Sequence, residues 1–263
     1  SLGEALLWQN KAYQRRTFAL WEFLADRYKE ETTIAGYDLL NEAVVGDPKI
    51  LNRFYKNLIK IIRGVDRHHL LFVEGNTWAT DLACLDEPSD DKVVWSIHVY
   101  QPTDFTFNSV PHLRYPFTWK GQRWDKAALR QLLSAYAKIA TRHSRPVHVG
   151  EFGVNVRYGF LGEDQWLKDI LACFKEFGFH WTYWTYKAVK NSVFPDGLFS
   201  YAENPVWVNR QGPRMGWEIY SSVWRERRED IIRSWKTQNF QRNTYLLNIL
   251  KDAARSNNRP PKL

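Results

Sequence analysis

The stretch IAGYDLLNE, residues 34–42, decides the fold class, because a mostly apolar run ends there in the polar pair Asn41 and Glu42. A short apolar run of this length predicts a buried strand. Residues 47–64 follow and open with Asp-Pro, which is typical of an N-cap and the first position of a helix. An amphipathic helix is predicted before the strand, over residues 10–30. The order helix, strand, helix therefore begins the chain.

The same unit recurs along the sequence. Further buried strands are predicted at 70–75, 93–100, 146–153 and 180–186, and further helices at 125–143 and 163–177. Strands that alternate with helices predict a parallel sheet with helices outside it. The fold class is therefore α/β.

Each predicted strand ends in a polar or aromatic residue. The carboxyl ends of parallel strands are where α/β proteins build their sites, so these residues are the candidates for chemistry. They are Asn41, Glu42, Glu74, His98, Tyr100, Glu151 and Trp184. Because side chains alternate along a strand, His98 and Tyr100 share one face, and Glu151 lies on the opposite face from His148. We expect His148 to lie in the core or against a helix.

Two glutamates at the ends of parallel strands suit glycoside hydrolysis. Retaining enzymes hold two carboxyl groups about 5–5.5 Å apart, of which one attacks the anomeric carbon and the other protonates the departing oxygen. Repulsion between the two keeps one of them protonated near neutral pH. A glutamate at a strand end is more often a surface or ion-pair residue, so the assignment of Glu42 and Glu151 depends on the residues around them.

Four segments around these glutamates resemble glycoside hydrolase family 5, in the clan of retaining (β/α)8-barrel glycosidases. In family order they are YDLLNEA (37–43), VWSIHVY (94–100), VHVGEFG (147–153) and WTYW (181–184). The resemblance implies that Glu42 is the acid/base and Glu151 the nucleophile. It implies further that Asn41 binds the 2-hydroxyl of the sugar, that Tyr100 orients Glu151, that His98 lines the same subsite and that Trp184 forms its floor.

The resemblance covers strands four to eight of the TIM-barrel type, so the (β/α)8 fold is expected to be incomplete and to end in C-terminal helices. Residues 1–224 are predicted to form this part of the barrel, and residues 225–263 a basic helical extension packed on it. The arginine and histidines of the family's second and third strands have no counterpart. Ala43 stands where the family has proline, with a small expected effect on the turn.

Five strands leave two open sheet edges, which are a liability for a protein in water. A second chain or a further copy of this chain could complete the barrel, or the C-terminal helices could cover the gap. We expect completion of some kind.

The predicted activity is retaining hydrolysis of a β-linked polysaccharide, with β-1,4-glucan first and mannan and β-1,3-glucan as open alternatives. No cofactor or metal is expected, because no metal-ligand motif appears. Glu74 matches no catalytic position of the family and is assigned a supporting role. Trp78 and Trp119 are candidates for outer sugar subsites or for ordinary packing. The first alternative function is a degenerate barrel that binds carbohydrate without turnover.

The net charge of +8 raises nucleic-acid binding as a further alternative. Residues 225–263 hold ten Lys/Arg and four Asp/Glu, hence six of the eight net charges, and no nucleic-acid-binding motif accompanies them. A solvated helix explains this charge better, so no nucleic-acid partner is expected.

The sequence has no run of 18 apolar residues, so no membrane span is predicted. Location stays open, with secretion favoured over the cytoplasm, and Cys84 and Cys173 could form a disulfide.

Overall fold

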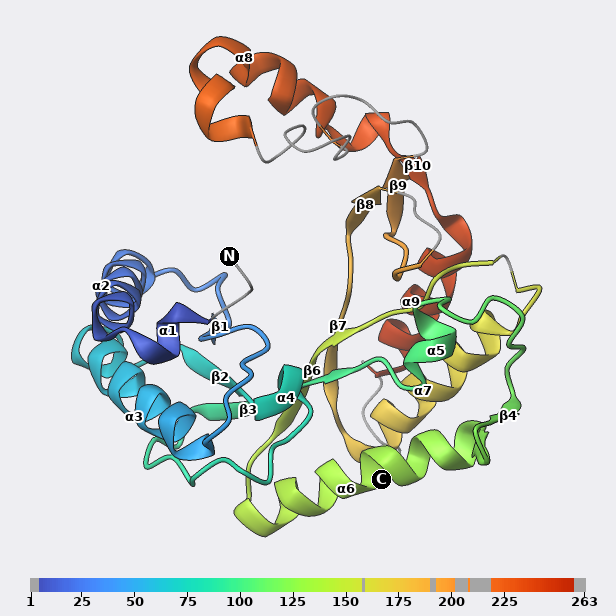
Figure 1. Ribbon diagram of the computed structural model, residues 1–263, viewed down its shortest axis with the longest axis horizontal. Coiled ribbons are helices and arrows are strands. Elements are labelled where there is room, and N and C mark those ends of the chain that lie inside the picture. The colour runs from blue at the N-terminus through green and yellow to red at the C-terminus, as the bar shows by residue number, and fades with distance from the viewer. Residues whose placement is uncertain (1–4, 158, 190–192, 202–207, 209–218, 258–263) are drawn as a thin grey trace. The chain divides into compact units, whose positions relative to one another are not determined.

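The computed structural model describes residues 5–157, 159–189, 193–201, 208 and 219–257 (Figure 1). Its contacts divide the chain into two compact units. Unit 1 comprises Ser1–Val99, Leu133–Gly150 and Phe179–Trp181, and unit 2 comprises Tyr100–Leu132, Glu151–Gly178 and Thr182–Leu263. The predicted division at residues 224 and 225 stays a prediction, and its last residues, 258–263, lie outside the described part of the chain.

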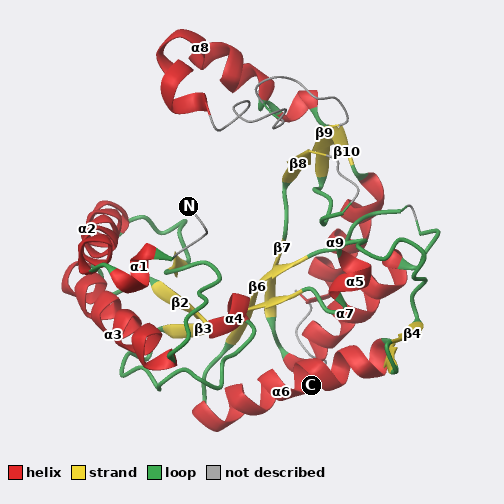
Figure 2. Ribbon diagram, in the orientation of Figure 1, coloured by secondary structure: helices red, strands yellow, loops and turns green. Residues whose placement is uncertain are grey.

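A five-stranded sheet carries most of the predicted strands (Figure 2). Its order is β1 (Gly36–Asp38), β2 (Leu70–Glu74), β3 (Val93–Val99), β6 (Val147–Phe152) and β7 (His180–Tyr183). β1 pairs with β2, and β2 with β3, in parallel. All seven residues of β3 are buried, as expected for a near-continuous apolar run in a parallel sheet. β1 ends at Asp38, earlier than predicted, so Asn41 and Glu42 lie in the loop that follows the strand.

The helices of unit 1 precede its strands or connect them along the chain. They include α1 (Leu6–Gln9), α2 (Lys11–Tyr28), α3 (Pro48–Val65), α4 (Asn76–Ala79) and the greater part of α6 (Lys126–His143). α3 begins as predicted, because the Asp47 side chain accepts a hydrogen bond from the Lys49 amide at 3.0 Å. Its buried residues recur every three or four positions, and α2 lies beside it (Figure 1).

Unit 2 holds the remaining elements. They are α5 (Thr103–Thr106), β4 (Phe117–Trp119), β5 (Gln122–Trp124), α7 (Glu163–Phe177), β8 (Lys187–Val189), β9 (Phe199–Tyr201), α8 (Tyr220–Ser234), a 3-10 turn (Thr237–Asn239), β10 (Gln241–Arg242) and α9 (Thr244–Asn257). α9 packs on α7, and Lys175 donates to the Ser256 carbonyl at 3.1 Å. The β4–β5 hairpin lies between the predicted strand at 93–100 and the predicted helix at 125–143, where no strand was predicted, since three-residue strands have too few residues to show a side-chain period.

In the part of the chain that the structure describes, no helix is both long and apolar enough to cross a bilayer. Cys84 is half-buried and Cys173 is buried, and both are free thiols in this structure. Burial raises the pKa of Cys173 to about 11, which keeps this thiol protonated at neutral pH.

A buried polar network at the start of β2 ties the sheet to the helices of unit 1. Asp66 is 1% exposed and accepts hydrogen bonds from the amides of His68 at 2.8 Å and His69 at 3.1 Å. Its other oxygen accepts from the Tyr37 hydroxyl at 2.7 Å and lies 2.6 Å from His69 Nδ1. Burial alone would raise the pKa of the Asp66 carboxyl, but these hydrogen bonds prevail and lower it to about 2.

We expect Asp66→Asn to lower the free energy of unfolding at pH 7 by about 2 kcal/mol, since each unit of pKa shift corresponds to about 1.4 kcal/mol. The folded-state pKa is lowered, so this contribution is complete above the ordinary pKa of 3.8 and is lost as the pH falls towards about 2. Urea unfolding at a series of pH values should show that the difference in free energy of unfolding between the wild type and Asp66→Asn becomes smaller below pH 3.8. Asp26→Asn is the control, because Asp26 is exposed beside Lys29. A difference in free energy of unfolding that stays constant down to the lowest accessible pH would contradict this account.

Candidate active site

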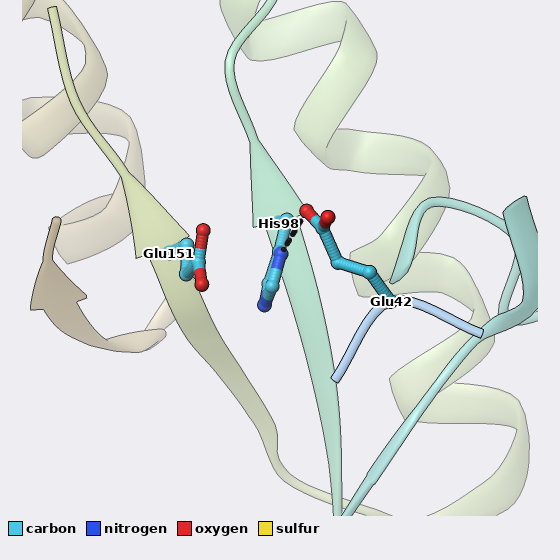
Figure 3. A group of neighbouring side chains, drawn as sticks. All are labelled: Glu42, His98 and Glu151. Carbon is cyan, nitrogen blue, oxygen red and sulfur yellow. Dashed lines mark hydrogen bonds and ion pairs between the residues drawn. The ribbon is translucent and has the colours of Figure 1, made fainter. Parts of the chain in front are cut away.

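Unit 1 brings Glu42, Glu74 and His98 together around one imidazole ring. His98 lies on β3 and its side chain is 2% exposed. Its Nδ1 lies 2.8 Å from Glu42 Oε1, and its Nε2 lies 3.1 Å from Glu74 Oε1. The Glu42 side chain is 30% exposed, whereas that of Glu74 is 2% exposed. Figure 3 shows the bond between Glu42 and His98. The carboxyl group that is open to solvent is therefore linked through His98 to one that is buried.

The backbone of Glu42 is held in an unusual conformation. Its φ is +50°, in the left-handed region that residues other than glycine seldom adopt. The Glu42 amide donates to Glu74 Oε2 at 2.5 Å. Asn76, two residues after Glu74, accepts a hydrogen bond from the Val45 amide at 2.9 Å and donates one to the Val45 carbonyl at 3.0 Å. The residues at and after the end of β2 thus fix the loop that carries Glu42, which offsets the cost of its backbone strain.

The neighbours of Glu42 in the sequence differ in exposure. Asn41 is exposed, so its amide is open to a ligand, whereas Ala43 is buried at 4% exposure. The alanine that replaces the family's proline therefore packs into unit 1.

Unit 2 brings Tyr100 and Glu151 together. Glu151 lies near the end of β6, and the Tyr100 hydroxyl donates to Glu151 Oε2 at 2.7 Å. Tyr100 follows β3 directly, and its carbonyl accepts from the Thr106 hydroxyl at 2.5 Å. A phenol donor favours the ionised form of a carboxyl group. The contact therefore suits a carboxylate that acts as a nucleophile.

Gly150, the residue before Glu151, belongs to unit 1 and requires the absence of a side chain. A Cβ at this position would lie 2.6 Å from Ser96 Oγ and 3.4 Å from His98 Nε2. Glycine therefore allows the backbone of β6 to approach the side chains of β3 closely. This explains why the sequence has glycine directly before Glu151.

Trp184 follows β7 and presents an accessible indole. Trp184 is a large apolar residue, and it is 41% exposed. The Trp184 amide donates to the Phe152 carbonyl at 2.9 Å, and the Trp184–Thr185 peptide bond is cis. A Cβ on Gly153 would lie 2.5 Å from the Trp184 carbonyl oxygen. Within unit 2 the backbone that carries Trp184 is therefore held against the residues that follow Glu151.

The structure thus groups the predicted residues in two sets. Glu42 and His98 contact each other in unit 1, and Tyr100 and Glu151 contact each other in unit 2. Asn41 is placed beside Glu42 by the chain alone. Within either unit taken alone, the described residues include no group of three His, Cys, Asp or Glu side chains that could hold a metal.

Glu74 has a larger part in the site than the sequence indicated, because it contacts both His98 and the backbone of Glu42. The available signal was an acidic residue closing an otherwise apolar strand. His148 is half-buried, with its ring 5.1 Å from that of Phe72, and burial lowers its pKa to about 4.

The two outer tryptophans differ in exposure. Trp78 is 58% exposed on a turn in which Thr77, Trp78 and Ala79 all have positive φ. Trp119 is half-buried and donates to Asp104 Oδ2 at 2.9 Å.

Comparison with known proteins gives a consistent result. Residues 7–190 match the sequence model of "Cellulase (glycosyl hydrolase family 5)". A β-xylosidase of Phanerodontia chrysosporium is 31% identical over 198 residues, which are 70% of this chain and 40% of that protein. Endoglucanase C of Acetivibrio thermocellus is 24% identical over 219 residues, which are 72% of this chain and 64% of that protein. The chain spans less than two thirds of the length of either relative.

Solved structures resemble the fold. Endoglucanase Cel5A of Thermotoga maritima superposes with a TM-score of 0.61 at 24% identity, over 75% of this chain and 65% of that one. The same enzyme in complex with mannotriose gives a TM-score of 0.61 at 22% identity. These likenesses confirm the (β/α)8 fold class, and the described residues supply five strands of its sheet.

Proposed function

Because the chain belongs to glycosyl hydrolase family 5, we propose that it hydrolyses a β-linked polysaccharide with retention of configuration, with β-1,4-glucan as its first candidate substrate. The observation that carries the proposal is the 2.7 Å hydrogen bond from the Tyr100 hydroxyl to Glu151. A nucleophilic carboxylate must stay ionised and correctly turned, and one donor at this distance does both.

The mechanism follows from the roles of the two glutamates. Glu151 attacks the anomeric carbon while Glu42 gives its proton to the departing glycosidic oxygen, which leaves a glycosyl ester on Glu151. Glu42 then takes a proton from water, and that water displaces Glu151 from the anomeric carbon. Two inversions give net retention, and each proton that Glu42 loses in the first step is regained in the second.

The other predicted residues position the sugar. Asn41 is exposed and close in sequence to Glu42, so its amide is available to the 2-hydroxyl of the sugar whose bond is cleaved. The exposed indole of Trp184 suits the apolar face of a pyranose ring. Relatives include enzymes named endoglucanase and cellodextrinase, and a neighbour binds mannotriose, so glucan and mannan are the substrates to compare.

The direct test is to incubate the wild-type chain with barley β-glucan, carboxymethylcellulose, mannan, xylan and laminarin and to follow reducing ends. Proton NMR during the first minutes identifies the anomer released. Retention predicts that the β-anomer appears first and mutarotates afterwards. An initial α-anomer would mean an inverting mechanism and would overturn the assignment of Glu151 as nucleophile.

A second candidate function is carbohydrate binding without turnover. The described residues form five strands of a sheet that has eight in a complete barrel of this type. Binding of cello-oligosaccharide in a calorimeter, with no product after prolonged incubation, would support it. Completion of the sheet by a second chain stays a prediction, and gel filtration with light scattering tests it.

We expect Trp184→Ala to lower kcat/KM for cello-oligosaccharides roughly tenfold, because the apolar face of the sugar ring loses the indole on which it packs. Trp184→Phe should recover most of this loss, since phenylalanine keeps a flat ring. The matched control is Trp224→Ala, because Trp224 lies on α8 and is 42% exposed, close to the exposure of Trp184. Equal losses in the two alanine variants would show that Trp184 contacts no sugar.

A further inference from the structure

Glu74 offers both of its carboxylate oxygens to the groups that determine how Glu42 is held. Oε1 lies 3.1 Å from His98 Nε2, and Oε2 accepts from the Glu42 amide at 2.5 Å. The side chain is 2% exposed, so these contacts replace water as its hydrogen-bond partners. A buried carboxylate that lacks such partners is strongly unfavourable, so the burial of Glu74 depends on these two contacts.

The contact with His98 has a chemical consequence. A neutral imidazole carries one N–H, so one of its nitrogens donates and the other accepts. If Nε2 donates to the buried Glu74 carboxylate, Nδ1 is left as an acceptor. Nδ1 lies 2.8 Å from Glu42 Oε1, and two acceptors do not form a hydrogen bond. Glu42 must then bear the proton that closes this contact, which is the form that a general acid requires.

We propose that Glu74 is a positioning residue that holds His98 in the Nε2–H tautomer and thereby holds Glu42 as the protonated acid. The inference rests on the proposed function only in its last clause, because the tautomer is a property of the resting protein. The bond from the Glu42 amide to Glu74 Oε2 adds a second link, which fixes the left-handed backbone of Glu42. In the first reaction step the Glu42 proton goes to the departing oxygen, and His98 keeps its Nε2 proton throughout.

The surroundings of Glu74 support a fixed geometry. The Tyr55 hydroxyl from α3 donates to the Glu74 carbonyl at 3.1 Å, and burial raises the pKa of this phenol well above its ordinary value. Gly75 leaves no room for a Cβ, which would lie 2.4 Å from the Asp81 carbonyl oxygen. The backbone around Glu74 is therefore closely confined, and its carboxylate acts from a defined position.

The kinetic test uses aryl β-cellobiosides, because a good leaving group departs without a proton and a poor one does not. We expect Glu74→Met, which keeps the length of the side chain and removes both acceptors, to lower kcat/KM on the order of 10²-fold for a methylphenyl leaving group. With 2,4-dinitrophenol as the leaving group the change should stay within about twofold, since no acid is needed. Glu74→Gln keeps one acceptor and should recover part of the loss.

The matched control is Glu163→Met. Glu163 and Glu74 are each 1% exposed as whole residues, and Glu163 also anchors a loop, since it accepts from the Gly159 amide at 2.7 Å and the Leu161 amide at 3.3 Å. Its loss should lower thermal stability and leave the ratio of the two kcat/KM values unchanged. Equal losses for both leaving groups in Glu74→Met would assign Glu74 a merely structural role and overturn the proposal.

The spectroscopic test does not depend on activity. Nitrogen-15 NMR of labelled imidazoles, with the His98 signals assigned by His98→Asn, should show the Nε2–H tautomer in the wild type and a mixture in Glu74→Met. A wild-type His98 that is doubly protonated, or protonated on Nδ1 alone, at neutral pH would overturn the proposal. If the wild type cleaves no glycoside, the proposed function fails, and these signals still decide the inference about Glu74.

Discussion

Glu151→Ala is expected to reduce release of reducing sugar from β-1,4-glucan to the background of a mock preparation. The nucleophile forms the covalent bond that splits the reaction into two steps, and alanine offers no atom to make it. The Tyr100 hydroxyl would be left without the carboxylate to which it donates at 2.7 Å. Reducing-end assays on the purified variant, with circular dichroism to confirm its fold, measure the effect.

Rescue by a small anion separates a lost nucleophile from a damaged site. Azide can enter the space that the truncated side chain leaves and attack the anomeric carbon of an activated β-cellobioside directly. A single displacement inverts the configuration, so Glu151→Ala with azide should give the α-cellobiosyl azide. Tyr100→Phe is the companion variant, because it keeps Glu151 and removes its donor, and its loss should be partial. Wild-type activity in Glu151→Ala would end the assignment.

The strands and helices were predictable wherever a regular pattern of apolar side chains continues through several helical turns or through a whole strand. β3 is buried over all seven of its residues, α3 begins at the N-cap Asp47 and α7 ends at Gly178, and both helices have apolar stripes. The three-residue strands β4 and β5 were not predicted, and β1 was predicted but is shorter than its apolar run. The left-handed backbone of Glu42 was also beyond sequence reasoning, because glutamate carries no preference for positive φ and the contact that stabilises it comes from Glu74, 32 residues away.

The division into units was invisible in the sequence for a related reason. It separates Gly150 from Glu151 inside β6, where neither composition nor charge changes. The candidate acid and its partner His98 belong to one unit, and the candidate nucleophile and its donor Tyr100 belong to the other. Each of these two pairs of groups is arranged within its own unit.

Glu42→Ala is expected to lower kcat/KM for substrates with poor leaving groups by about 10²–10⁴-fold, which is the range for the loss of a general acid. The same variant should act nearly normally on 2,4-dinitrophenyl β-cellobioside in the first step, because this leaving group departs as an anion. The second step lacks its base, so the glycosyl ester on Glu151 should accumulate and a burst of dinitrophenol should precede a slow steady state.

Azide tests the same residue from the opposite side. In Glu42→Ala the anion needs no base to attack the glycosyl ester, so it should raise the steady-state rate and give the β-azide after two inversions. The α-azide expected from Glu151→Ala and the β-azide expected from Glu42→Ala assign opposite roles to the two carboxyl groups. The partly exposed carboxyl of Glu42 leaves space for the anion, whereas the buried Glu74 does not, so Glu74→Met should show no azide rescue. An α-azide from both alanine variants would contradict the double displacement, because only a single inversion would then have occurred in each.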